Sequence, residues 1–297
     1  MIRKVFSFFT SLCLLVSCFG QDPDHIRTPG EVRQSIKTAA TDYDRAIMLL
    51  DEAIAYVLKP GSEISDLDSA NRLIDQVYKI NSILNDKHVE AKSLLASAEV
   101  LHDRGDTASG HAAINKAIDI YKNLSVPDEL GEAYLHLGTY FMLESLQDVG
   151  RIIPVYENAL TQFRKSANKK RVADTLKELA DFNQIVNKHG LALVQLKEAL
   201  SLYQSIGFKA VQGVYDLMGS VSEYLGDYAN AVQYGLLAVK TAAATQDTTI
   251  QLCTIYSRLA IAYADWSKEE EADLYFSKAM AIAEKYHDKG SIDLVMV

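Results

Sequence analysis

The chain has 297 residues, of which 48% are apolar and 23% charged, and its net charge is −9. This is the composition of a soluble globular protein, and it excludes a disordered polymer and a membrane protein of many spans. The acidity argues against a protein that binds the nucleic-acid backbone, because such proteins present a basic face. Only 15 glycines and 5 prolines are present, which favours long helices joined by short turns.

The first twenty residues have the layout of a secretory signal peptide. Arg3 and Lys4 precede an apolar run at 5–16, and polar residues follow at 21–24. Twelve apolar residues are too few to cross a bilayer, which needs about 20. We therefore predict export, with residues 1–20 as a signal peptide and 21–30 as a linker.

Two kinds of cleavage fit the end of this signal. Residues 15–18 (LVSC) resemble the bacterial lipobox, in which the cysteine is lipidated, so Cys18 is a lipidation candidate. Residues 18–20 (CFG) equally resemble an ordinary cleavage site that leaves Gln21 first. The protein is thus expected either in the periplasm or as a membrane-anchored lipoprotein of the cell envelope. Cys253 alone remains in the folded part, so no intrachain disulfide is expected, and its apolar surroundings predict a buried thiol.

Residues 31–85 are predicted to form two helices ahead of the repeats. Apolar residues at helical spacing run from Val32 to Val57 and predict one long helix that begins at the capping box of residues 28–31. A second helix is predicted over about 66–84. The alternatives for this segment are a helical hairpin and a degenerate first repeat, because residues 42–53 also mimic the second helix of a repeat. Either would cover the apolar face of the first repeat.

Small residues then recur at an interval of about 40 residues, which is the sign of a repeat architecture. Three such series keep the same register along the chain. They comprise Ala98, Gly138, Ala180, Gly219 and Ala260; Ala70, Gly110, Ile152, Ala192, Ala231 and Ala272; and Val77, Ala117, Ala159, Ala199, Ala238 and Ala279. The intervals predict five repeats over 86–286, at 86–126, 127–167, 168–206, 207–246 and 247–286, with a tail or a cut-off helix at 287–297.

Each repeat is predicted to contain two helices joined by a tight turn. In the fourth, Gly226 supplies a left-handed end to the first helix and Asp227 caps the second. Gly105 and Asp106 repeat this pair, whereas residues 187–189 and 267–269 lack the glycine. In the second repeat, Pro154 is expected in the first turn of the second helix. Small residues at fixed positions would let the helices approach closely.

These residues resemble the tetratricopeptide repeat family, in an extended form with a period near 40. The motif matches include Leu137-Gly138 with Phe141, Leu179-Ala180 with Ala192 and Ala199, Met218-Gly219 with residues 226–228 (GDY), Ala231 and Ala238, and Leu259-Ala260 with Tyr263, Ala272, Phe276 and Ala279. The resemblance implies an all-α fold, a right-handed superhelical solenoid of antiparallel helix pairs. HEAT and armadillo repeats share the period but lack the Gly-Asp-Tyr turn.

The residues carry no motif for catalysis, cofactor binding or metal binding. Phosphate-binding glycine loops, H-E-x-x-H, C-x-x-C and G-x-S-x-G in a turn are all missing, and the seven histidines form no i, i+4 pair. His136 is expected to be packed or to line a groove, and most of the 16 tyrosines fall at core positions. We therefore expect no enzyme, no cofactor and no metal.

The resemblance also implies which residues line a concave groove, since motif positions 2, 5, 9 and 12 of each first helix do so in this family. Six acids and two lysines are among them, which suits a neutral or basic partner. The alternative is an ordinary solvated face. The candidates are Lys92, Leu95, Glu99, His102, Glu132, Leu135, Thr139, Met142, Asp174, Lys177, Asp181, Gln184, Asp216, Ser220, Glu223, Ser257 and Ile261.

Two functional interpretations follow. The first is a non-catalytic scaffold of the bacterial cell envelope that holds a peptide or partner protein in the groove, with membrane contact only through a lipid at Cys18. The second is a stand-alone or truncated sensor region of a signalling protein, because similar exported arrays form the input regions of such proteins. A hydrolase that uses groove carboxylates is a remote third.

Overall fold

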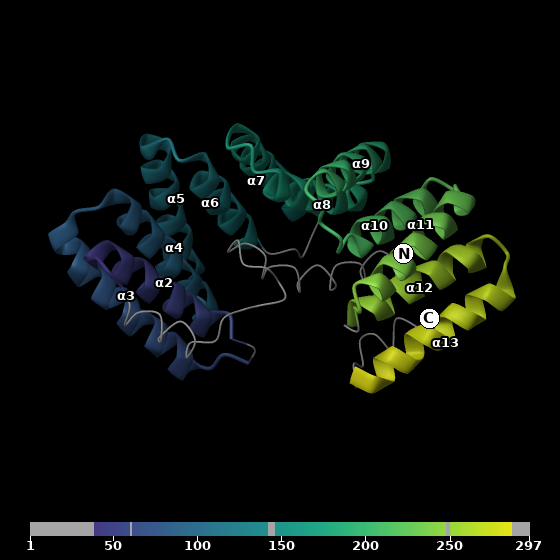
Figure 1. The fold of residues 1–297 in the computed structure, drawn as a ribbon, viewed down its shortest axis with the longest axis horizontal. Coiled ribbons are helices and arrows are strands. Elements are labelled where there is room, and N and C mark those ends of the chain that lie inside the picture. The colour runs from purple at the N-terminus through teal and green to yellow at the C-terminus, as the bar shows by residue number, and fades with distance from the viewer. Residues whose placement is uncertain (1–38, 60, 142–145, 248–249, 287–297) are drawn as a thin grey trace. The chain divides into compact units, whose positions relative to one another are not determined.

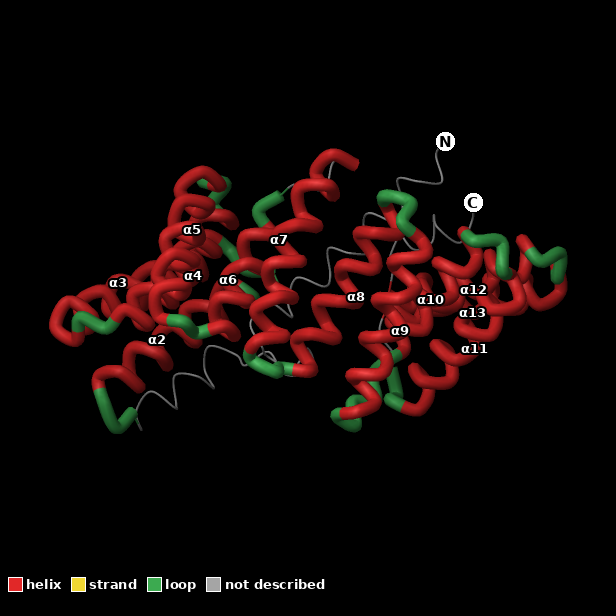
Figure 2. The backbone as a smooth tube through the Cα atoms, turned by 90° about the horizontal axis from the view of Figure 1, so that it is seen from above, coloured by secondary structure: helices red, strands yellow, loops and turns green. Residues whose placement is uncertain are grey.

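The computed structural model describes residues 39–59, 61–141, 146–247 and 250–286. In these ranges the chain forms helices and turns and no strand (Figures 1 and 2), as the all-α prediction requires. The helices are α2 (Asp42–Val57), α3 (Ile64–Leu84), α4 (Lys87–Asp103), α5 (Thr107–Leu124), α6 (Pro127–Thr139), α7 (Leu146–Lys165), α8 (Lys169–Ile185), α9 (His189–Ser205), α10 (Gln212–Tyr224), α11 (Tyr228–Ala244), α12 (Ile250–Asp265) and α13 (Glu269–Tyr286).

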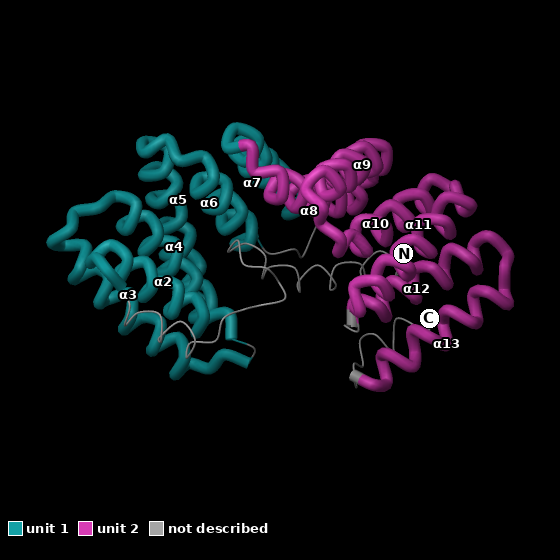
Figure 3. Tube along the Cα trace, in the orientation of Figure 1, with its two compact units in different colours: residues 1–166 teal, residues 167–297 magenta. Residues whose placement is uncertain are grey.

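The chain divides into two compact units, residues 1–166 and 167–297 (Figure 3). The first unit contains the helix pairs α2/α3, α4/α5 and α6/α7, and each pair packs against the next one along the chain. The hairpin α2/α3 shares an apolar core with α4 that includes Leu50, Ile74 and Val89. The N-terminal hairpin therefore covers the face of α4 that the first repeat would otherwise leave open.

The second unit contains the pairs α8/α9, α10/α11 and α12/α13. The first helices of these pairs are neighbours, since α10 contacts both α8 and α12. This brings residues of successive repeats, roughly 40 positions apart in the sequence, close to each other. The five expected ranges from 86–126 to 247–286 each hold one helix pair.

The turn within a repeat has the conformation that its residues predict. Gly105 and Gly226 adopt φ values of 84° and 76°, and the carboxylates of Asp106 and Asp227 accept hydrogen bonds from backbone N–H groups of the following helix. Ser267 occupies the corresponding turn before α13 with a φ of 57°. The left-handed turn is thus kept even where the glycine is missing.

These turns give a matched pair of stability predictions. A Cβ at Gly226 would meet no atom within 4 Å, so Gly226→Ala adds only backbone strain. We expect it to lower the free energy of unfolding by about 0.5–1 kcal/mol. The strain of an alanine in the left-handed conformation destabilises the folded state, and the smaller conformational freedom of alanine in the unfolded chain offsets part of that strain. Ser267→Gly should raise it by about the same amount. Chemical denaturation measures both, and equal signs for the two variants would contradict the explanation.

Small residues allow close helix approach, as the repeat series predicts. Ala98, Ala180 and Ala260 are at most 1% exposed. At Gly138, a Cβ would lie 2.4 Å from the ring of Tyr156 on α7, closer than real contacts allow. The glycine is therefore required by the packing of α6 on α7.

Two sequence predictions about helix bounds were wrong. The first described helix, α2, begins at Asp42 and does not continue upstream through residues 39–41, because Thr41 is extended and its hydroxyl accepts a hydrogen bond from the N–H of Asp44 as an N-cap. Ala39 and Ala40 are non-helical, and residues 1–38 lie outside the described part. The start at Asp42 agrees with the alternative that this segment mimics the second helix of a repeat.

Pro154 does not lie in the first turn of its helix. The helix α7 already begins at Leu146, so the proline stands in the helix interior. It is exposed there, and its ring therefore costs one backbone hydrogen bond without disturbing the core.

Several predicted features fall outside the described residues, namely the signal peptide with Cys18, the linker, Met142 and the tail at 287–297. Within the described ranges, the helices are too short or too polar to cross a bilayer.

Candidate functional site

The described candidates from the sequence all lie on the first helices of the repeats, α4, α6, α8, α10 and α12, and none of them is fully exposed. Half-buried are Lys92, Glu99, His102, Glu132, Thr139, Asp174, Lys177, Asp181, Glu223 and Ile261; buried are Leu95, Leu135, Gln184, Asp216, Ser220 and Ser257. The set is thus a partly covered face of polar and apolar residues on the first helices.

In the first unit, His136 of α6 binds Glu99 of α4. The distance from His136 Nδ1 to Glu99 Oε1 is 2.6 Å, and the histidine is buried, as expected of a packed residue. His102 lies one turn further along α4, with its ring 4.8 Å from the ring of Tyr140. Its hydrogen bond to Asp103, together with the charge of Glu99, raises the pKa of His102. Protonation of this imidazole is therefore favoured.

Sequence reasoning missed a second group of contacting polar side chains in the first unit. Tyr43 Oη lies 3.0 Å from His88 Nδ1, and His88 Nε2 lies 3.2 Å from Glu129 Oε1. Burial and the charges of nearby acids, Glu129 among them, raise the pKa of Tyr43, so its hydroxyl is not activated as a nucleophile. His88 and Glu129 are 41 positions apart, which is about one repeat. That spacing is the sequence signal that could have identified them as a pair.

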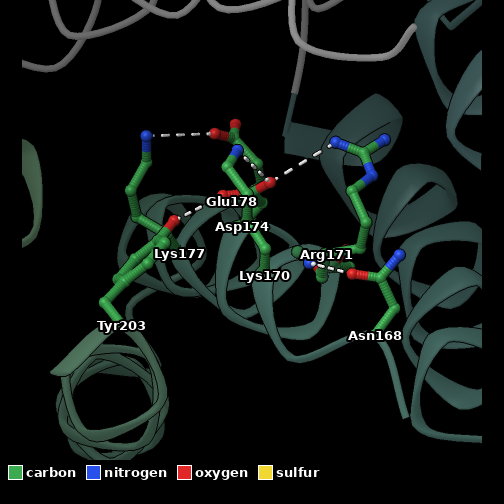
Figure 4. Close-up of polar contacts among 8 residues, drawn as sticks. Asn168, Lys170, Arg171, Asp174, Lys177, Glu178 and Tyr203 are labelled. Atoms are coloured by element: carbon green, nitrogen blue, oxygen red, sulfur yellow. Dashed lines mark hydrogen bonds and ion pairs between the residues drawn. The ribbon is translucent and has the colours of Figure 1, made fainter. Parts of the chain in front are cut away.

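In the second unit, Asp174 of α8 collects several donors (Figure 4). Its carboxylate accepts hydrogen bonds from Tyr203 Oη at 2.6 Å and from Lys170 Nζ at 3.3 Å, and Arg171 Nη1 lies 3.5 Å away. Tyr203 belongs to α9 and is 4% exposed. The cluster therefore ties the second helix of this repeat to the first, which is a structural role for a predicted groove residue.

Glu178, on the same helix, faces Lys177 at 3.5 Å (Figure 4). Burial raises the pKa of the Glu178 carboxyl, and Asp181 and Asp174 add to the effect while Lys177 opposes it. The folded chain therefore resists the ionisation of this group.

This shift predicts a pH-dependent effect of Glu178→Gln. Because the folded-state pKa is raised, the carboxyl costs no stability at pH values below its unfolded pKa, and the cost grows as the pH rises through the folded-state value. The variant should thus be more stable than the parent at pH 8, and the difference should vanish near pH 4. Thermal unfolding at both pH values measures this, and a difference that grows toward low pH would refute it.

In this unit, two side-chain contacts join the first helix of one repeat to the first helix of the next. Gln184 Nε2 of α8 donates to Ser220 Oγ of α10 at 2.6 Å, and Arg258 of α12 binds the carboxylate of Asp216 on α10. Burial raises the pKa of Asp216, while Arg258 acts in the opposite direction. Arg258 thus reduces the negative charge of this face, which the motif positions alone did not reveal.

Ser257 precedes this arginine on α12. It is fully buried, and its hydroxyl donates to the backbone carbonyl of Cys253 at 2.9 Å. Cys253 is also 0% exposed, which confirms the prediction of a buried thiol. Ser257 is therefore a helix-packing residue, and its proposed place in the groove was wrong.

Among the residues that the structure describes, no group of three or more His, Cys, Asp and Glu side chains could hold a metal ion. The aromatic residues serve packing in several places. Tyr215 and Tyr263 are half-buried against apolar clusters, and Tyr263 also stacks on Tyr275 with ring centroids 5.7 Å apart.

Neither a protein-family model nor a curated protein matches this chain. Solved structures do. BtubC from P. vanneervenii is 18% identical over 75% of this chain and 91% of its own, with a TM-score of 0.64. A putative kinesin light chain of P. anserina with TPR-like repeats is 14% identical over 68% of this chain and 98% of its own, with a TM-score of 0.55.

A signal transduction ATPase from Pyrococcus horikoshii with a tetratricopeptide repeat sensor is 14% identical, with a TM-score of 0.68. The match covers 90% of this chain but 42% of that protein, so this chain spans about two fifths of its length. At these identities the similarity is one of fold. By its fold the chain is a tetratricopeptide-like repeat protein, built from antiparallel helix pairs.

Proposed function

We propose that the chain is a non-catalytic interaction scaffold that binds a segment of a partner polypeptide along the first helices of its repeats. The observation that carries the proposal is the set of contacts between the first helices of successive repeats. Glu99–His136 in the first unit, and Gln184–Ser220 and Asp216–Arg258 in the second, align polar side chains from consecutive first helices. Such rows offer hydrogen-bonding groups at regular intervals to an extended segment.

Charge favours a neutral or basic partner. The groove candidates on the described first helices include six acids against the two lysines Lys92 and Lys177, so acids outnumber lysines among them; the acids are Glu99, Glu132, Asp174, Asp181, Asp216 and Glu223. An anionic segment would meet repulsion there, whereas a basic one gains from the field. The proposal needs no cofactor and no nucleic acid.

Panning the purified chain against phage-displayed random peptides tests the proposal. We expect enrichment of neutral or basic peptides whose binding weakens when Asp181 and Glu223 are both changed to the corresponding amides. Failure to enrich any peptide would speak against a peptide-binding scaffold, and so would enrichment of acidic ones.

We further propose that the protein is exported to the cell envelope, on the basis of the basic start and apolar run of residues 1–16. Mass measurement of the mature N-terminus tests this. A lipid-modified Cys18 identifies the anchored form and a free Gln21 the periplasmic form, whereas an intact chain that starts at Met1 would contradict export.

A sensor region is the second candidate, since the match to the archaeal protein with a tetratricopeptide repeat sensor extends over 90% of this chain. It predicts that the gene lies beside one for a kinase or a transcription regulator and that the two proteins bind each other. Lack of binding between this chain and the product of such a neighbour would remove the sensor candidate.

A further inference from the structure

The last described helix, α13, lacks a neighbour that the other second helices of its unit have. The helix α9 packs on α8 and on α10, and α11 packs on α10 and on α12. In contrast, α13 packs on α12, and no described helix follows it (Figure 1). Among the described residues, the side of α12/α13 that corresponds to the covered side of α10/α11 is therefore open.

The preceding repeat shows what covers this side. Leu252 and Ile255, in the first two turns of α12, pack with Tyr215 of α10 and with Ala238 and Ala242 of α11. Ile255 is 0% exposed there, and Leu252 is half-buried. The start of a first helix, with two apolar side chains three residues apart, thus closes the repeat before it.

The open side of the last pair carries apolar residues at the matching positions. Tyr256 of α12 stands 41 positions after Tyr215, and Met280 of α13 stands 41 positions after Val239, which belongs to the same covered cluster. Both Tyr256 and Met280 are half-buried, so part of their apolar surface faces solvent. A segment that resembles the start of α12 would remove this surface from water.

The sequence that follows α13 contains such a segment. Residues 292–297 (IDLVMV) match residues 250–255 (IQLCTI) at a step of 42, and a step of 42 also occurs in each of the three series of small residues. At this step Leu294 and Val297 take the places of Leu252 and Ile255. Residues 292–297 themselves lie outside the described part of the chain.

We propose that residues 292–297 bind to the open side of α12/α13 as the start of a further first helix, with Leu294 and Val297 against Tyr256 and Met280. The occupant of this surface is thus a segment of the same chain. A second copy fits less well, because its own Leu252 and Ile255 are already packed within their repeat. The inference is independent of the proposed scaffold function and concerns a different surface.

Hydrogen exchange of the full chain, followed by mass spectrometry, tests the binding of this segment. Leu294→Asp together with Val297→Asp places two charges in the apolar contact, and the backbone amides of α13 should then exchange about tenfold faster, because the last pair opens more easily. Asp293→Asn is the matched control, since Asp293 takes the place of the exposed Gln251, and it should leave the exchange unchanged. Equal exchange of α13 in the parent and in the doubly substituted chain would refute the proposal.

A double-mutant cycle locates the contact. The thermal midpoint should fall in Leu294→Ala and in Met280→Ala, and the fall in the double variant should be smaller than the sum of the two, because both changes remove the same contact. Asp293→Ala combined with Met280→Ala should give additive shifts. Additive shifts for Leu294→Ala as well would exclude the contact. Faster exchange of α13 on dilution of the parent would identify a second copy as the cover and would also overturn the proposal.

Discussion

Replacing Arg258 with methionine is expected to lower the free energy of unfolding by about 2–3 kcal/mol. The reason is the partner that remains behind, since the side chain of Asp216 is only 7% exposed and must either keep an uncompensated charge or take up a proton. Full burial of both groups would give about 3–5 kcal/mol, and the 22% exposure of Arg258 lowers the expected value below that range. Chemical denaturation of the purified protein measures the change.

The double variant Asp216→Asn/Arg258→Met is the control for this prediction. It removes both charges, so it should be more stable than Arg258→Met alone. The deficit of Arg258→Met should also shrink at low pH, because the pKa of Asp216 is already raised by burial and rises further without the arginine. A deficit that is equal in the single and double variants would show that the ion pair is not its cause.

The second large effect is expected at Phe163 of α7. Its side chain is 0% exposed and covers Gly131 of α6, where a Cβ would lie 2.6 Å from the aromatic ring. Phe163→Ala should therefore lower the free energy of unfolding by about 3–5 kcal/mol, through lost burial and the cavity that remains. The thermal midpoint and the denaturation midpoint should both fall.

The facing glycine provides the test of this packing. Gly131→Ala alone should destabilise the chain by about 1–3 kcal/mol, because the ring must move. In the Phe163→Ala background the same change meets no ring, so it should be neutral or stabilising, as alanine is the better helix former. Equal penalties in both backgrounds would mean that the contact between Gly131 and Phe163 does not limit the packing of α6 on α7.

Local rules predicted the turn within a repeat, because the residues that specify it act within that turn. Gly226 and Asp227 specify their turn by backbone conformation and a single hydrogen bond, so the sequence suffices to place them. The start of α2 was harder to predict, because the apolar pattern continues upstream of Thr41 and only the cap decides where the helix begins. Pro154 was misplaced for a similar reason, since an exposed proline is tolerated inside α7.

The candidate site was predicted less completely because it depends on pairs of residues far apart in the chain. Motif positions select residues one at a time. They therefore identified Asp216 and Gln184 but not the side chains that these two residues contact. Arg258 stands outside those positions and Ser257 inside them, yet the arginine reaches the polar face and the serine hydroxyl bonds to the backbone of its own helix. Partners separated by one repeat, such as His136 and Glu99, could be found by comparing residues about 40 positions apart.

The neighbour-to-neighbour packing of the helix pairs has a consequence for how the chain folds. Within each unit, every helix packs on helices at most two places away along the chain. Closing such short loops costs little entropy, so each pair can form soon after its residues are released from the ribosome or from an export channel. The hairpin α2/α3 is then available as a template on which α4 can dock, and folding can proceed from the N-terminus while synthesis continues.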